Sequence, residues 1–501
     1  MSGARPLALG AAALLGGCAR GAREDAVIRF AVARPPRNLD PRLATDATSE
    51  RVNRLLYRTL VRLDAAARPV PGLARWERLG ATRYRFRLGE QGRLFSDGSR
   101  LTAHDVVATL ASIRAPGSRS PHRAALAGIA ALRARDDDTL ELVLHAPDAA
   151  LPSRLVLAVL PAAAIARDHP FVTAPIGSGP LRLVERSGPD ALLLERRADG
   201  QRIALVTVRD PSVRVMKLLR GEVDLLQGDL PPELVDHLAR APGIAVRAVP
   251  GANLSYLGFN LEDPRTGSLA VRRAIAQAID RPLLIHTLLG GRARLAESIL
   301  PPEHWAGRGD LAPWPHDPER ARALLAGAGF GPGNPLRLTL KTSSDPFRLR
   351  LAGALQAQLA TAGIALAVQG HDWGTFFGDV KAGRFSLYAL TWVGVQSPDI
   401  FRYALHSESL PPGGANRGRY RNDSVDRLIA TAARAPSLAA ARAPYAALQA
   451  IVHAELALVP LWYEDQVAAQ RATIRGYRPA GDGNYDGLAQ VVRVPVAAEE
   501  E

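Results

Sequence analysis

Three segments of this chain begin with an aspartate followed by a proline and continue with apolar residues at helical spacing; the pairs are Asp210-Pro211, Asp317-Pro318 and Asp345-Pro346. Aspartate is a favoured N-cap and proline is accepted at the first helical position, so each pair predicts the start of a helix. Residues 269–280 add a helix with one apolar face. Strand-like runs alternate with these helices at 202–208, 255–261, 335–341, 364–370 and 385–392. This alternation predicts lobes of the α/β class.

A separate unit is predicted over residues 61–174. Apolar and polar residues alternate at 82–88 and again at 138–144, which is typical of strands with one buried face. Between these strands lie an Asp97-Gly98 turn signal and a helix over 102–113 with Thr102 as its N-cap. We expect a compact α+β unit here.

The composition is that of a globular chain of more than one domain. A chain of 501 residues is too long for one hydrophobic core, and 47% apolar with 22% charged residues is ordinary for folded proteins. The formal charge is +14, but the basic residues are almost all arginines spread evenly along the chain, without a basic block or an RNA-binding aromatic signature. We therefore expect no nucleic-acid partner.

The N-terminus predicts export and a lipid anchor. Arg5 precedes an apolar run over 7–15, which is too short to span a bilayer, and Leu15-Gly16-Gly17-Cys18 resembles a bacterial lipobox. Cys18 is the only cysteine of the chain, which favours lipidation over an ordinary signal peptide with a chance cysteine. We expect a signal peptide over 1–17, a lipidated linker over 18–24 and a periplasmic or cell-envelope protein held to a membrane by acyl chains.

Signatures of catalysis are missing from the sequence. It contains no HExxH, GxSxG or Walker motif and no GxGxxG that opens a helix after a strand. Its eleven histidines never stand four residues apart. The glycine-rich segment 177–180, GSGP, is interpreted as a tight turn rather than a phosphate cradle. We expect no enzyme, no cofactor and no resident metal, and leave open a metal-chelate ligand held by distant histidines.

A series of segments, in order along the chain, carries a family resemblance. They are RLLYRTLVRLD (54–64), YRFRLGEQGRLFSDGSRLTAHDVVATL (84–110), IGSGPLRLVE (176–185), DPSVRVMKLLRGEVDLL (210–226), NLSYLGFNLEDP (253–264), VRRAIAQAIDRPLLIHTLLGGRA (271–293), DPERARALLAGAGF (317–330), LQAQLATAGIALAV (355–368) and VPLWY (459–463). The series resembles the extracytoplasmic solute-binding proteins of peptide-type ABC transporters, the family of oligopeptide-, dipeptide- and nickel-binding proteins. Sugar-binding proteins of other ABC systems share the lobes but not this series.

The resemblance implies an α/β two-lobed periplasmic-binding-protein clamshell with mixed sheets and an extra α+β domain. Ligand binds between lobes that swing about hinge strands. The implied boundaries are 25–60 with 175–255 and 466–495 for lobe I, 61–174 for the extra domain, 256–465 for lobe II, and hinges near 250–255 and 462–466. The implied function is a monomeric, lipid-anchored receptor that hands a peptide or peptide-like small solute to an ABC permease.

Several residues are implied to face the ligand. Trp373 and Trp392 stand at the ends of predicted strands, where ligand sites of α/β lobes gather, although core packing is the alternative for each. Tyr256 and Asn260 share a strand face near the lobe junction, and a buried structural amide is the alternative for Asn260. The polar loop 43–49 matches the loop that faces the ligand in relatives, through Thr45, Asp46 and Ser49.

The charged anchors differ from the family pattern. Relatives that bind free peptides carry, after the tryptophan, an aspartate that holds the α-amino group, and here that position is Val395, followed by Gln396 and Ser397. Arg348 or Arg350 stands near where dipeptide-binding relatives hold a carboxylate; an exposed helix-start arginine is the alternative. A free N-terminus on the solute is therefore not required, and a longer, N-blocked or non-peptide solute stays open.

Two alternatives from other classes remain at this point. One is an extracytoplasmic peptidase or esterase, against which the missing catalytic signatures count. The other is a lipoprotein with a chaperone or interaction role that uses the same clamshell as a surface.

Overall fold

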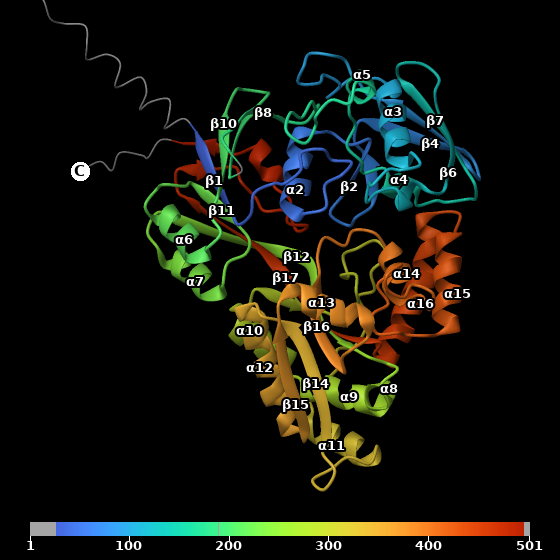
Figure 1. The fold of residues 1–501 in the computed structure, drawn as a ribbon, viewed down its shortest axis with the longest axis vertical. Helices are drawn as coiled ribbons and strands as arrows, with labels where there is room; N and C mark the ends of the chain where they lie inside the picture. Colours follow the sequence, from blue (N-terminus) through green and yellow to red (C-terminus); the bar gives the residue numbers. More distant parts are fainter. Residues whose placement is uncertain (1–26, 189, 495–501) are drawn as a thin grey trace, which may run out of the picture.

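The two longest strands, β12 (Ile244–Phe259) and β17 (Leu458–Arg471), run antiparallel through the middle of the molecule and belong to both of its halves (Figure 1). The structure is a computed structural model that describes residues 27–188 and 190–494. Residues 1–17 and Cys18, on which the export and lipidation predictions rest, lie outside the described residues. Among those that are described, no helix is long and apolar enough to span a bilayer.

The upper half is built on five shorter strands: β1 (Ile28–Val32), β8 (Leu181–Arg186), β9 (Ala191–Arg196), β10 (Arg202–Thr207) and β11 (Leu225–Gln227). β1 pairs in parallel with β10 and β11, and β11 pairs antiparallel with β17. The helices of this half are α2 (Ala47–Leu56), α6 (Pro211–Leu219) and α7 (Pro232–Arg240). The C-terminal segment returns here as β18 (Ile474–Arg475), η2 (Asp486–Ala489) and β19 (Val492–Arg493), and Tyr477 and Tyr485 pack on Phe30.

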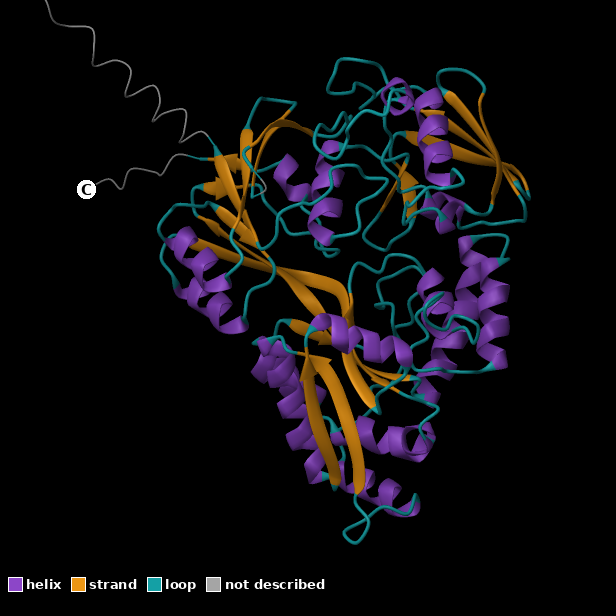
Figure 2. Ribbon diagram, viewed as in Figure 1, coloured by secondary structure: helices purple, strands orange, loops and turns teal. Residues whose placement is uncertain are grey.

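The lower half is built on β14 (Leu336–Ser343), β15 (Ile364–His371) and β16 (Leu387–Trp392), with β13 (Ala293–Leu295) beside β17. The strands of the two halves form one sheet in the order β15-β14-β16-β12-β17-β11-β1-β10-β9-β8, with β13 paired to β17 off this path, whereas β18 and β19 form a separate two-stranded sheet. Helices flank the strands (Figure 2): α8 (Pro264–Gly267), α9 (Leu269–Ala278), α10 (Arg281–Leu289), α11 (Pro318–Gly327), α12 (Pro346–Thr361), α13 (Trp373–Ala382), α14 (Asp399–Leu405), α15 (Asp423–Ala433) and α16 (Leu438–Glu455).

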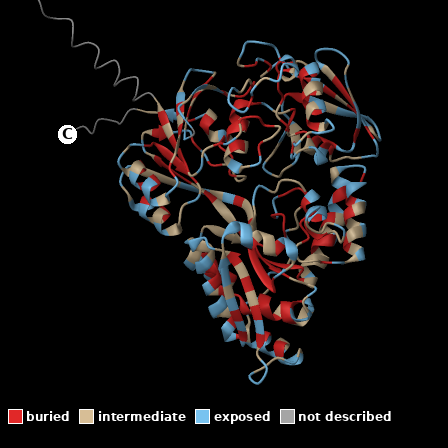
Figure 3. Ribbon diagram, in the orientation of Figure 1, coloured by how far each residue is buried: buried red, intermediate tan, exposed pale blue. Residues whose placement is uncertain are grey.

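The lower half has a core on each face of its sheet, and the buried residues follow the strands (Figure 3). Successive side chains of a strand point to opposite faces. Accordingly Leu257 and Phe259 join the cluster made with α9 and α12, whereas Leu254 and Tyr256 join the cluster made with α13 to α16. This alternation places Tyr256 on the face that also carries Trp392.

The small unit at the upper right of Figure 1 has its own sheet and core. Its antiparallel strands lie in the order β4 (Ala74–Gly80), β5 (Arg83–Leu88), β7 (Thr139–Leu144) and β6 (Ile129–Ala134). α3 (Ala103–Arg114) packs on this sheet with a capping box made by Thr102 and Asp105. The unit also contains the ribbon β2 (Val61–Leu63) with β3 (Pro69–Pro71) and the short turns α4 (Leu151–Arg154), α5 (Ala162–Ala166) and η1 (Ala124–Leu126).

The strands and helices predicted from the sequence are present, and the three Asp-Pro pairs cap their helices: Asp210, Asp317 and Asp345 each accept a hydrogen bond from a main-chain N–H of the first turn. One prediction was too short. The strand expected at 255–261 is the end of the sixteen-residue β12. Pro250 and Gly251 look like strand breakers in the sequence, but β12 accommodates them in a register shift between Val249 and Asn253. A bulge of this kind tolerates a residue without an N–H.

Candidate functional site

The candidate site lies where β12 and β17 pass from one half to the other, beside a second register shift between Ser255 and Tyr256. Ser255 of β12 donates a 2.6 Å hydrogen bond to Glu464 of β17 and is 2.7 Å from the Thr391 hydroxyl of β16. Arg348, in the first turn of α12, reaches the same place: its guanidinium lies 3.5 Å from the Ser255 hydroxyl and 3.9 Å from the Glu464 carboxylate. The structure thus brings Arg348 to the crossing strands, with Glu464 as its partner.

Trp392 forms an aromatic wall with Tyr256. As the last residue of β16 it lies opposite Leu254 of β12, and its ring stacks on Tyr256 at 6.1 Å with 9° between the planes. Tyr403 of α14 lies edge-on at 6.3 Å and is 48% exposed. Tyr256 itself is buried, which raises the pKa of its hydroxyl. Trp392 keeps an exposed part, so this wall has a buried back and an accessible front.

Trp373 forms a second aromatic group with Phe377 on α13. The Trp373 ring is 59% exposed and stacks on Phe377 at 5.3 Å with 9° between the planes. Asp372 caps this helix by accepting from the N–H of Thr375, and Phe376 turns into the core. The exposed Trp373 ring and the partly buried Phe377 ring thus form a small aromatic surface on the first two turns of α13.

Arg417 joins the two aromatic groups. Its guanidinium carbon lies 4.6 Å from the centre of the Trp392 ring and 5.3 Å from that of Phe377. One terminal nitrogen donates a 3.1 Å hydrogen bond to the hydroxyl of Tyr256. No carboxylate lies within 4.0 Å of this guanidinium in the part of the chain that the structure describes. Arg417 is therefore a cation on an aromatic surface with its charge uncompensated.

The loop that carries Arg417 is held on both sides. The Asn416 side chain donates to the carbonyls of His406 and Tyr420 and accepts from the Tyr420 N–H. The carbonyl of Gly418 accepts from the N–H of Leu261, and a side chain on Gly418 would come within 2.8 Å of the Phe259 carbonyl. Arg417 thus projects from a fixed main chain. The sequence gives no sign of it, because it is one arginine among many in a loop without periodicity.

The loop after Trp392 connects the lower half to the C-terminal segment. The Gln396 side chain donates a 2.8 Å hydrogen bond to the Asp482 carboxylate. The main-chain carbonyl of Gln396 is 3.1 Å from Nε2 of His304, whose pKa is lowered by burial. Val395 packs on the aromatic core cluster, and the hydroxyl of Ser397 accepts from the N–H of Asp399. These contacts place an apolar side chain and an occupied amide where the resemblance implies an acid.

The loop predicted in the upper half is shaped by its own polar side chains. Asp46 caps α2 by accepting from the N–H and the hydroxyl of Ser49, at 2.9 and 2.6 Å. The buried Ser49 hydroxyl also accepts from the N–H groups of Arg37 and Asn38, at 2.8 and 3.0 Å. Thr45 is exposed. Burial and the neighbouring Asp46 carboxylate raise the pKa of Glu50 to about 7, although Arg54 opposes the shift.

The side chains of Asn260 and Arg350 are hydrogen-bonded to other parts of the protein. Both amide hydrogens of Asn260 are used within the protein, by the carbonyls of Gly383 and Phe385 at 3.1 and 3.2 Å. Arg350 of α12 donates a 2.6 Å hydrogen bond to Glu233 of α7, which joins the lower half to the upper. The described residues contain no group of three or more His, Cys, Asp or Glu side chains that would hold a metal ion.

Comparison with protein families finds a family model that matches most of the chain. The model of the bacterial extracellular solute-binding proteins, family 5 (middle region), matches residues 41–409. Probable di/tripeptide-binding protein 5 of Pseudomonas aeruginosa (strain UCBPP-PA14) is 29% identical over 323 residues, which are 63% of this chain and 61% of that protein. The dipeptide-binding protein of Escherichia coli (strain K12) is 24% identical over 502 residues, which are 91% of this chain and 92% of that protein.

Solved structures share the fold over nearly the whole chain. The ABC transporter substrate-binding protein CtaP from Listeria monocytogenes has a TM-score of 0.86 at 21% identity, covering 94% of this chain and 99% of that one. The periplasmic binding protein DppA from Helicobacter pylori, in complex with the peptide STSA, has a TM-score of 0.76 at 23% identity, covering 95% and 100%. The predicted α/β clamshell fold is confirmed.

Proposed function

The chain belongs to family 5 of the bacterial extracellular solute-binding proteins, which are binding proteins rather than enzymes; from this premise we propose that it binds a peptide or peptide-like solute between its two halves and delivers it to the permease of an ABC transporter. Its relatives named for di- and tripeptides, and the structural neighbour that holds a peptide, support a peptide as the solute class. Closure of the halves about β12 and β17 would enclose the solute.

The observation that carries this proposal is Arg417 between Trp392 and Phe377. Aromatic surfaces give contact area to side chains of many shapes without a fixed hydrogen-bond pattern, which suits a receptor for varied peptides. A guanidinium without an acidic partner supplies one strong, directional contact for a carboxylate. Arg417, and not an acidic side chain at Val395, is then the charged anchor of the site.

The anchor determines which end of the solute is recognised. Val395 offers no carboxylate to a free amine, and the amide of Gln396 is occupied by Asp482. We therefore assign the carboxylate of the solute, at its C-terminus or on a side chain, to Arg417, with the aromatic rings along the neighbouring residues. A blocked amino terminus is tolerated in this arrangement.

Calorimetry and thermal-shift assays with the processed chain test which end of the solute is recognised. Three ligands are compared: trialanine with two free ends, N-acetyl-trialanine and trialanine amide. A ligand that binds only the folded state raises the melting temperature by mass action. The first two peptides are expected to bind, and the amide more weakly by about tenfold or more, because it lacks the carboxylate. Equal binding of all three would overturn the role of Arg417, and binding by none would favour an interaction protein instead.

The same incubations test the enzyme alternative. Mass spectrometry of the recovered trialanine peptides is expected to show them intact. Release of alanine or acetate in proportion to protein concentration would instead support an enzyme that hydrolyses amide bonds, as a peptidase does.

A lipid anchor at Cys18 is the finer part of the proposal. The lipobox-like Leu-Gly-Gly-Cys segment supports it. Cells that express the full chain should yield a membrane-associated, acylated form, and Cys18→Ala should abolish acylation. Globomycin, which blocks the lipoprotein signal peptidase, should cause precursor to accumulate. Unchanged processing in both experiments would count against the anchor.

A further inference from the structure

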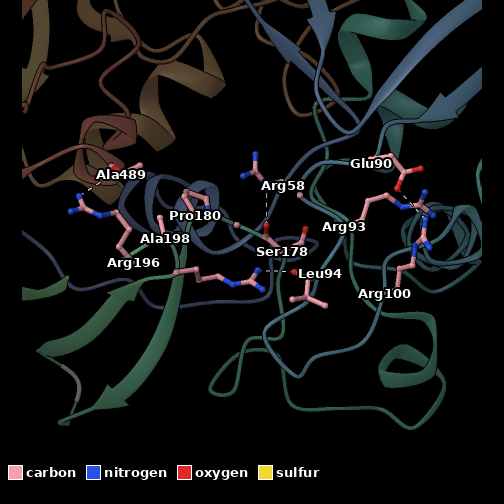
Figure 4. A pocket seen from close by; sticks show the side chains of 13 residues that line it. Arg58, Glu90, Arg93, Leu94, Arg100, Ser178, Pro180, Arg196, Ala198 and Ala489 are labelled. Carbon is pink, nitrogen blue, oxygen red and sulfur yellow. Dashed lines mark hydrogen bonds and ion pairs between the residues drawn. The ribbon is translucent and has the colours of Figure 1, made fainter. Parts of the chain in front are cut away.

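A cavity of about 590 Å³ lies where the small unit meets the upper half (Figure 4). The 90–100 hairpin of the small unit, the 178–180 segment and the end of β9 contribute to its wall. It shares no residue with the Trp392–Arg417 surface. Its volume is in the range of sites for small organic molecules.

The wall of this cavity is strongly basic. Five arginines and one glutamate line it: Arg58, Arg93, Arg100, Arg196, Arg197 and Glu90. Three of the arginines have acidic partners, since Arg93 is 2.5 Å from Asp138, Arg100 is 3.3 Å from Glu90 and Arg196 is 2.7 Å from Asp199. The other two, Arg58 and Arg197, have none within 4.0 Å among the described residues.

Arg58 and Arg197 bond only to carbonyls and keep free donors. Nε of Arg58 donates to the carbonyl of Ser178 at 3.1 Å, and its two terminal nitrogens have no partner in the described part of the chain. The terminal nitrogens of Arg197 donate to the carbonyls of Leu94 and Phe95, at 2.6 and 3.3 Å. Burial and nearby positive charge lower the pKa of both: Arg62 acts on Arg58, and Arg58 with Arg182 acts on Arg197.

Ser178 adds an unpartnered hydroxyl to the same wall. It is 1% exposed, and its Oγ has no hydrogen-bond partner among the residues described. In Figure 4 it lies below Arg58, between Arg196 on one side and Arg93 on the other. A buried hydroxyl without a partner is costly unless something else binds it.

Close contacts hold this arrangement in place. A side chain on Gly92, which has a φ of +75°, would be strained and would come within 2.4 Å of Nε of Arg58, so it would displace that guanidinium. A side chain on Gly179 would come within 2.2 Å of the carbonyl of Leu55. The GSGP segment thus packs closely on residues 55–57, with a bend at Gly179-Pro180 rather than the hydrogen-bonded tight turn expected from its composition, and Ser178 lines the cavity.

We propose that this cavity is a second ligand site, which binds a small organic anion with two or more negative charges through Arg58, Arg197 and Ser178. A polycarboxylate and a phosphate ester share the required chemistry, because both present several oxygen acceptors to paired arginines. The bound anion would neutralise the two uncompensated guanidinium groups and satisfy the Ser178 hydroxyl. It would also connect the small unit to the upper half, since residues of both line the cavity.

The test is calorimetry of the processed chain with citrate, glycerol 3-phosphate and, as an uncharged control, glycerol. Binding of either anion and not of glycerol is expected, with affinity that falls as salt concentration rises. Citrate alone would assign the polycarboxylate, and glycerol 3-phosphate alone the phosphate ester. Absence of binding by both anions at low salt would overturn the proposal.

Variants locate the binding. Arg197→Gln and Ser178→Ala are each expected to lower the affinity for the anion, because each removes a contact to it. For Arg197→Gln the expected loss is about tenfold. Arg75→Gln removes one positive charge from an exposed position of the same unit and should change the affinity by less than about twofold. If Arg197→Gln fails to fold, Arg58→Lys and Ser178→Ala decide. Undiminished affinity in Ser178→Ala combined with Arg58→Lys would refute the site.

Discussion

The guanidinium of Arg417 lies 4.6 Å above the ring of Trp392 while donating to the hydroxyl of Tyr256, on which the same ring is stacked. The three side chains come from a loop and from two neighbouring strands, β16 and β12. Tyr256 is buried and fixes the other two, so the cation is held in one orientation before a ligand arrives. Such preorganisation lowers the entropy cost of binding.

Arg417→Gln should weaken binding of N-acetyl-trialanine by about tenfold to a hundredfold, because a hydrogen bond to a charged group contributes ~1.5–3 kcal/mol. Calorimetry measures this loss. Arg421→Gln removes the same charge from an exposed position of the same loop and should leave the affinity unchanged. Equal affinities for both variants would show that the solute does not reach Arg417.

Trp392→Ala should reduce the affinity for the same peptide and leave the fold intact. The indole is partly exposed and one of its faces is covered by Tyr256, so its removal costs about 1–2 kcal/mol of stability. Trp76→Ala is the matched control, since Trp76 is a partly buried tryptophan that packs on Phe86 in the small unit. It should lower the melting temperature without changing the affinity. A wild-type affinity in Trp392→Ala would remove this residue from the site.

Asn260→Ala should do the opposite, lowering stability but not affinity. The substitution leaves the carbonyls of Gly383 and Phe385 without their donor, and a buried unsatisfied group costs about 1–3 kcal/mol. Thermal unfolding measures the first effect and calorimetry with N-acetyl-trialanine the second. A selective loss of affinity at unchanged melting temperature would return Asn260 to the ligand contacts.

Asn260 illustrates where sequence reasoning reaches its limit. The polar side chains that cap a helix or form a buried hydrogen bond are also those that contact a ligand. The sequence pattern alone therefore does not separate a structural role from a ligand contact for Asn260, Asp46 or Ser49. The two tryptophans are singled out in the sequence because alternation and length predict where a strand stops; Trp392 ends β16, and Trp373 begins α13, two residues after β15. Arg417 was not predicted, because its contact with Trp392 joins a loop to a strand 25 positions earlier in the chain.

The fold was predictable for a related reason. Helix starts such as Asp345-Pro346 and alternating strands such as 82–88 are local, and their order along the chain resembles a family pattern. The continuous β12 was not predicted, because Pro250 and Gly251 interrupt its sequence pattern. Its continuity comes from pairing with β17, which resumes at Asn253 after the register shift. Long-range pairing of this kind leaves no local signal.

Glu50→Gln should raise stability at pH 8 but not near pH 4.5. The folded-state pKa of Glu50 is raised from 4.5 to about 7, so the folded protein retains a proton there that the unfolded chain releases. The resulting stability is fully present below pH 4.5 and is lost as the pH rises to about 7. The side chain is 44% exposed, so solvent screening limits the gain at pH 8 to roughly 1 kcal/mol.

Melting temperatures of Glu50→Gln and the native chain, measured from pH 4.5 to pH 8, test this dependence. Glu408→Gln, at an exposed loop position, should have a melting temperature that changes with pH in the same way as that of the native chain. A constant difference between Glu50→Gln and the native chain across the range would contradict the raised pKa.

The 2.6 Å contact between Arg350 of α12 and Glu233 of α7 leads to a prediction about opening of the two halves. A second pair, Arg292 with Asp236, joins the same helix α7 to the lower half. The carboxylates of both pairs are more than 40% exposed, so each pair contributes about 0–1 kcal/mol and neither holds the fold together.

Such an energy is still enough to shift an equilibrium between open and closed arrangements several-fold. Glu233→Gln combined with Asp236→Asn should therefore increase the radius of gyration of the ligand-free protein in small-angle X-ray scattering, with the melting temperature nearly unchanged. Arg182→Gln breaks a pair with Glu195 inside the upper half and should leave the scattering unaltered. If the double variant scatters like the native chain, the two pairs do not govern closure, and the closed arrangement depends on contacts such as Gln396 with Asp482 instead.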